Sequence, residues 1–167
     1  MLPLLALSGL FAPAVATPTP AGQFVGHAAR ICLVTRADPA AVRQMAQKER
    51  WTSVDPASLP GYPPQYIAGG RVFTRTHAWK LERGGTAYWV GLFDLADEPT
   101  VRDCSFMGWD LDFEAVNAVF LGKNPPPKGA KPEIPIRMYK FPDATLIYGW
   151  SGIGERRLHV VSVTPKP

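Results

Sequence analysis

Apolar residues recur along the chain with a helical period near its start and with a period of two further on. The first apolar stripe predicts a helix from Gln23 onward. Its members are Phe24, Ala28, Ile31 and Cys32. A second helix is predicted from Asp38 toward Trp51, because Asp38 can accept backbone N–H bonds as N-cap and Pro39 needs no donor at the first helical position.

Three strand-like segments follow these helices, and two or three more close the chain. The first group is 72–81, 86–95 and 101–109, and the second is 136–141, 144–150 and 157–164. Short turns within each group favour antiparallel pairing. Between the groups, residues 110–122 predict a third helix, with acidic residues at its N-terminal end and Gly122 as a left-handed C-cap.

The predicted order is two helices, three strands, one helix and three strands. This order indicates an α+β fold: one two-layer domain with a mainly antiparallel sheet of five to six strands and two to three helices. Residues 53–70 contain four prolines and three glycines, and residues 123–135 form a basic, proline-rich connection. We expect both segments to be exposed and to serve as interaction surfaces.

The first sixteen residues, MLPLLALSGLFAPAVA, contain no charged side chain. Their apolar block ends in Ala14-Val15-Ala16, the small-x-small pattern that a signal peptidase accepts. We therefore expect a signal peptide over 1–16, a linker over 17–22 and a single domain over 23–167, in the periplasm or outside the cell. A buried N-terminal core helix is the alternative. No apolar segment is long enough for a transmembrane span.

Two cysteines, Cys32 and Cys104, are present, and both have apolar neighbours. In an exported chain, two cysteines most simply form one disulfide, because the compartment is oxidising. Such a bond would fix the first helix to the third strand. The alternative is a pair of buried free thiols.

The chain of 167 residues has a net charge of +4 that is unevenly distributed. Residues 94–114 contain seven acidic residues and one arginine, a net charge of −6, which leaves +10 for the remainder. A basic body with one acidic strip favours binding to an anionic envelope polymer or to another envelope protein. The predicted export and the lack of a recognisable nucleic-acid motif argue against nucleic acid as a partner.

No motif in the sequence identifies a catalytic or cofactor site. The histidines have no metal ligand at i+4, the turn at 151–154 lacks the third glycine of a phosphate-binding loop, and no serine-nucleophile motif occurs. We therefore predict no catalytic residue, no cofactor and no metal site.

Four basic or protonatable residues form one candidate anion-binding surface. Arg75 and His77 lie two apart in the first predicted strand, and Arg157 and His159 lie two apart in the last. Residues two apart share a face of a strand, so the four residues would form one surface if the two strands are neighbours. The alternative is that they are ordinary solvated positions on the open face of the sheet.

These features together favour a small exported envelope protein that acts by binding and not by catalysis. One alternative is a hydrolase that acts on envelope or cell-wall material, with a site assembled from residues distant in sequence. Another is an exported inhibitor or accessory subunit that uses an exposed loop.

Overall fold

The computed structural model describes residues 19–61, 65–68, 70–98, 102–122 and 136–166. The predicted signal peptide and the connection 123–135 lie outside these residues. The helical elements are α1 (Pro20–Ala28), the π-helical turn η1 (Ala29–Leu33), α2 (Pro39–Lys48), the 3-10 turn η2 (Pro56–Ser58) and α3 (Phe113–Leu121). The strands are β1 (Thr52–Ser53), β2 (Gln65–Ala68), β3 (Arg71–Arg83), β4 (Thr86–Leu95), β5 (Arg102–Trp109), β6 (Ile136–Lys140), β7 (Ala144–Ile153) and β8 (Arg156–Pro165).

These strands form one antiparallel sheet in the order β1-β3-β4-β5-β8-β7-β6, and β2 pairs with the first part of β3. The predicted α+β class is confirmed, with three α-helices in the described residues. The predicted count of five to six strands was too low. The additional strands, β1 and β2, are too short to show an alternating pattern, and their pairing with β3 makes them strands.

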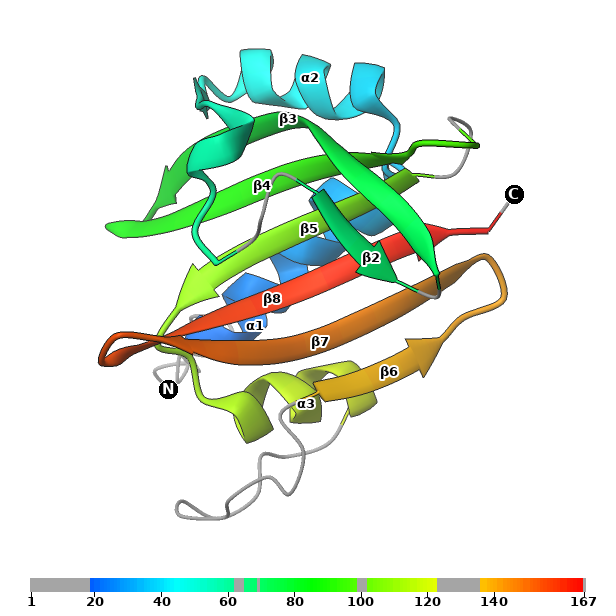
Figure 1. Cartoon of the computed structure of the whole chain (residues 1–167). Coiled ribbons are helices and arrows are strands. Elements are labelled where there is room, and N and C mark those ends of the chain that lie inside the picture. Colours follow the sequence, from blue (N-terminus) through cyan, green and yellow to red (C-terminus); the bar gives the residue numbers. More distant parts are fainter. Residues whose placement is uncertain (1–18, 62–64, 69, 99–101, 123–135, 167) are drawn as a thin grey trace, which may run out of the picture.

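The helices cover one face of the sheet, with α1 behind the central strands and α2 above β3 (Figure 1). The main core lies between helices and sheet, where Phe24 of α1 meets Phe106 of β5 and Tyr148 of β7. All three side chains are inaccessible to solvent. On the front face, a smaller core forms where Leu59 packs near Met107 of β5. The central strands therefore bury apolar side chains on both faces of the sheet.

Local sequence signals set the helix ends. The side chain of Asp38 accepts a bond from a backbone N–H at the start of α2, as predicted. Gly122 ends α3 with a left-handed backbone at φ 63°, also as predicted. The first helix begins earlier than expected, inside the segment 17–22, because Thr19 caps it and Pro20 is accepted in its first turn.

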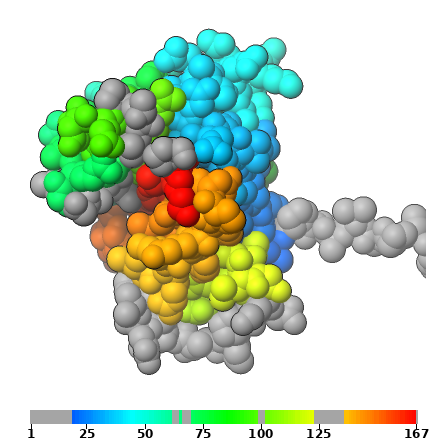
Figure 2. Space-filling view, turned by 90° about the vertical axis from the view of Figure 1, so that its right-hand side faces the viewer, coloured from blue at the N-terminus to red at the C-terminus, as the bar shows by residue number. Residues whose placement is uncertain are grey.

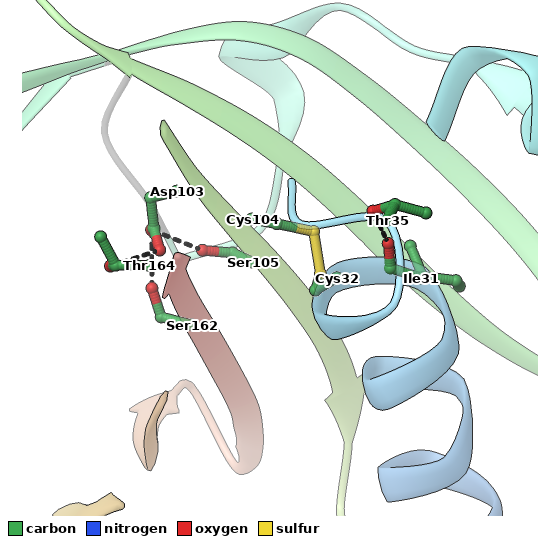
Figure 3. The surroundings of a disulfide bond; sticks show 8 residues. All are labelled: Ile31, Cys32, Thr35, Asp103, Cys104, Ser105, Ser162 and Thr164. Atoms are coloured by element: carbon green, nitrogen blue, oxygen red, sulfur yellow. Dashed lines mark hydrogen bonds between the residues drawn. A yellow bond between two sulfur atoms is a disulfide. The ribbon is translucent and has the colours of Figure 1, made fainter. Parts of the chain in front are cut away.

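A disulfide between Cys32 of η1 and Cys104 of β5 fixes the helical layer to the sheet, as the sequence predicted (Figure 3). The two Cα atoms are 5.4 Å apart, and both cysteines are fully buried. Next to Cys104, the buried carboxylate of Asp103 points to the opposite face of β5. It accepts hydrogen bonds from Ser162 Oγ at 2.6 Å and Thr164 Oγ1 at 3.1 Å, which tie β5 to β8.

We expect Gly61→Ala to destabilise the fold by about 2 kcal/mol, because two costs coincide at this position. Its backbone has φ +72°, and an added Cβ would lie 2.4 Å from Leu158 Cδ2. Urea unfolding followed by circular dichroism measures the change. Gly26→Ala in α1 is the matched control, since no atom lies within 4 Å of its added Cβ, and it should raise stability slightly. Equal effects of both substitutions would contradict the tight packing at Gly61.

Candidate functional site

The structure does not bring the four predicted anion-binding residues together. Strands β4 and β5 lie between β3, with Arg75 and His77, and β8, with Arg157 and His159. A β-bulge between Arg75 and His77 also turns these two side chains to opposite faces, because they pair with the consecutive β4 residues Phe93 and Leu92.

The surroundings of these residues differ strongly. Arg75 is only 5% exposed on the front face, where it lies over the Phe93 ring and donates a hydrogen bond to the carbonyl of Pro56. Arg157 is exposed and lies 4.8 Å from the centre of the Trp150 ring. Of the four residues, only His77 lines a described surface groove.

His77 lies in a groove between the end of α2 and β3, with a volume of about 370 Å³. We call it the α2–β3 groove; its lining is Arg43, Ala46, Gln47, Arg50, Trp51, Ser53, His77 and Trp79. A second hollow of about 220 Å³ continues from it along β3 and shares Arg50 and Trp51 with it. Lys80, Glu82 and Arg83 line this second hollow, where Lys80 pairs with Glu82 at 3.1 Å and Arg83 pairs with Glu49.

The end of α2 gives the groove its shape. Val42 and Ala46 are buried, so Arg43 and Gln47 lie beside the buried stripe on the open side of the helix. Beyond Lys48 the chain turns sharply at Arg50, which has φ 57° and takes a left-handed position that usually favours glycine. The Trp51 N–H then bonds to the Ala46 carbonyl at 2.9 Å, which closes the turn.

His77 forms the floor of the groove together with Trp79. The two rings are stacked, with centres 5.7 Å apart and planes inclined by 7°. Arg43 Nη2 lies 2.7 Å from His77 Nε2, so the guanidinium donates to an unprotonated ring nitrogen. Burial and the nearby Arg43 charge lower the pKa of His77. His77 is therefore neutral at pH 7 and holds the Arg43 side chain in the groove.

The acidic residue closest in sequence to the groove is already neutralised by other cations. The Glu49 carboxylate binds Arg30 of η1 and Arg83 of β3, and it accepts a hydrogen bond from the indole N–H of Trp51 at 3.2 Å. Hydrogen bonding to Arg30 lowers the pKa of Glu49 to about 2. Within the described residues neither Arg43 nor Arg50 forms an ion pair, so both carry uncompensated positive charge into the groove.

Arg43 and Arg50 were not among the predicted site residues, because the prediction of α2 rested on its apolar face and its N-cap. A usable signal was present: Arg43, Gln47 and Arg50 recur at i, i+4 and i+7, directly before a tryptophan. This polar stripe runs along one side of α2 and ends where the chain enters the next strand. Only the fold, however, brings His77 and Trp79 to the same place.

His159 neither contributes to an anion-binding surface nor lies on an open face of the sheet. It is fully buried, and its Nδ1 lies 2.7 Å from the hydroxyl of Tyr148, which is also fully buried. Burial, and secondly the charge of Arg157, lower the pKa of His159 to about 4. Burial also raises the pKa of Tyr148. Both groups are therefore neutral near pH 7 and form a polar contact inside the core.

No three of the His, Cys, Asp and Glu side chains in the described residues gather as metal ligands would. None of the helices in this described part of the chain combines the length and the apolar character needed to cross a membrane. In the comparisons with known proteins, no protein-family model matches this chain, and no curated protein or solved structure is significantly similar to it.

Proposed function

We propose that this protein is an exported binding protein that holds an anionic envelope polysaccharide in the α2–β3 groove. The observation that carries the proposal is the pair of arginines, Arg43 and Arg50, which face the groove without a carboxylate partner in the described chain. A guanidinium matches the planar, two-oxygen geometry of carboxylate and phosphate groups. The groove therefore favours an acidic ligand.

The walls of the groove favour a sugar polymer over a small free anion. The ring that the groove offers to the C–H face of a sugar is the half-buried His77, which is held in place by stacking on the buried Trp79. Trp51 and Trp79 are only 8% and 6% exposed and form the apolar base beneath it. The second hollow continues along β3, so a chain of several acidic sugars can span both hollows, with Arg43 and Arg50 as its unpaired cationic contacts. Repeated contacts along one polymer increase the apparent affinity.

Export is the second element of the proposal. The buried Cys32–Cys104 disulfide is typical of proteins in oxidising compartments, and the first sixteen residues have the pattern of a signal peptide. The hydrolase and inhibitor alternatives remain predictions. In the α2–β3 groove the described lining includes His77 and Ser53 but no carboxylate, so it lacks the acid that a His–Ser hydrolase would use to orient its histidine.

The double variant Arg43→Gln/Arg50→Gly tests the groove. We expect it to weaken binding to polygalacturonate about tenfold or more at low salt, because two charge-assisted contacts are lost. Glycine is chosen at position 50 because the left-handed backbone there favours it, so the fold is retained. Titration calorimetry measures the affinity, and neutral dextran should not bind.

The matched control removes the same amount of charge outside the groove. Lys48→Gln/Lys166→Gln affects two exposed lysines that do not line the groove and should change the affinity less than about threefold. Equal losses in the two double variants would mean that net charge alone drives binding. If the unmodified protein binds neither polygalacturonate nor a phosphorylated glycan at low salt, the proposed function is refuted.

A further inference from the structure

The hydrogen bonds of His77 fix its protonation state in the α2–β3 groove. Arg43 Nη2 lies 2.7 Å from His77 Nε2, and a guanidinium can only donate, so this ring nitrogen carries no proton. The other ring nitrogen, Nδ1, lies 3.1 Å from the hydroxyl oxygen of Thr76. That hydroxyl donates its own hydrogen to the Leu92 carbonyl at 3.4 Å, so its oxygen accepts a bond from Nδ1–H. His77 is therefore one neutral tautomer, with the lone pair of Nε2 directed at Arg43.

We propose that His77 makes the α2–β3 groove bind an acidic polymer more tightly as the pH falls, an inference that rests on the function proposed above. The protonated imidazole is a third cation beside Arg43 and Arg50. Its Nε2–H donates to an acidic group of the ligand, and Arg43, which then has no acceptor at Nε2, donates to the ligand as well. Without a ligand the same protonation is unfavourable, because it places a cation next to the Arg43 guanidinium.

The charged groups around His77 determine the sign of this effect. Arg43 faces the ring from α2, Arg50 lines the groove at the turn beyond that helix, and the rest of the lining is uncharged. Burial and the charge of Arg43 lower the pKa of His77, and the attraction of Asp94 on β4 opposes them only weakly. An anion bound to the two arginines reverses this balance, because an opposite charge within a few ångströms raises the pKa of an imidazole.

Proton linkage gives the direction and the size of the change in affinity. The pKa of His77 is higher in the complex than in the free protein, so binding takes up a proton and acidification increases the affinity. The gain is limited to about tenfold for each unit by which the two pKa values differ. The groove is accessible to protons from solvent, since Figure 2 shows α2 at the surface of the molecule, and both Arg43 and Arg50 are exposed.

Titration calorimetry with dextran sulfate at about pH 7.5 and about pH 5 tests the inference. Sulfate esters stay ionised over this range, so a change in affinity comes from the protein, and we expect about tenfold tighter binding at the lower pH. His77→Gln loses the ring and should bind more weakly at both pH values, but the two affinities should agree within about threefold. His27→Gln is the matched control: it removes a histidine with a lowered pKa that does not line the groove, and it should keep the tenfold change.

An NMR titration of the ligand-free protein examines the Arg43–His77 contact without any polymer. Arg43→Gln should raise the pKa of His77, because it removes the adjacent positive charge, and the imidazole C–H shifts report this change.

The outcomes separate this inference from the proposed function. If dextran sulfate binds equally well at both pH values, or if His77→Gln keeps the full pH dependence, the inference is overturned and the proposed function stands. An unchanged pKa of His77 in Arg43→Gln would also overturn the inference. If the protein binds neither dextran sulfate nor polygalacturonate at either pH, the proposed function fails and the inference fails with it.

Discussion

Replacing Cys32 and Cys104 together by serine should lower the free energy of unfolding by about 4 kcal/mol. The disulfide closes a loop with a sequence separation of 72, and the loss of such a constraint increases the conformational entropy of the unfolded chain. The serine hydroxyls would also be buried in the apolar core between η1 and β5. Equilibrium unfolding in urea, compared with the unmodified protein, measures the effect.

The consequences should be confined to stability. The α2–β3 groove contains neither cysteine, so at low temperature the folded double-serine variant should bind polygalacturonate as the unmodified protein does. A variant that keeps only one cysteine is a useful comparison, since it loses the cross-link and retains one apolar thiol. If both variants keep the urea midpoint of the unmodified protein, the disulfide contributes nothing to the free energy of unfolding.

Acidification from pH 7 to about pH 4 should remove about 3 kcal/mol of stability through His159 alone. Burial lowers the pKa of this imidazole from 6.5 to about 4 in the folded state, whereas in the unfolded chain it returns to the higher value. Below pH 6.5 the unfolded chain therefore binds a proton that the folded protein does not. Stability then falls with decreasing pH until about pH 4, where both states are protonated.

His159→Gln isolates this contribution. The neutral amide should lower stability at pH 7, because it cannot reproduce the imidazole contact with Tyr148. It should also reduce the slope of stability with pH between 6.5 and 4, which leaves the smaller part due to His77 and His27, whose pKa values are lowered as well. Glu49 acts in a separate window: its pKa of about 2 makes stability fall as the pH drops below about 4.5. Urea midpoints measured at several pH values distinguish the two groups. Identical slopes for the variant and the unmodified protein above pH 4.5 would exclude His159 as the sensor.

Local sequence signals predicted much of the fold because they depend on neighbouring residues. The Asp38-Pro39 start of α2 and the Gly122 end of α3 are set by caps and backbone freedom, which can be read from the sequence. The cysteine pair was predictable for another reason: with two cysteines there is one possible intramolecular disulfide.

The remaining features depend on contacts between distant segments. The short strands β1 and β2 exist because β3 is long enough to pair with both on the same side. The bulge that separates Arg75 from His77 shifts the alternation by one residue, and no local pattern marks it. The groove needs α2 to end beside β3, so the positions of Arg43 and Arg50 next to His77 could not be derived from the residues alone.

The place of β8 also determines when the protein can fold. It follows every other described strand in the chain, yet it lies between β5 and β7 in the middle of the sheet. Before residues 156–165 have been synthesised, β3–β5 and β6–β7 remain two incomplete sheets with nothing to join them. A growing chain therefore cannot complete its native sheet until this late segment is available, so the sheet forms only after nearly the whole described chain has been synthesised.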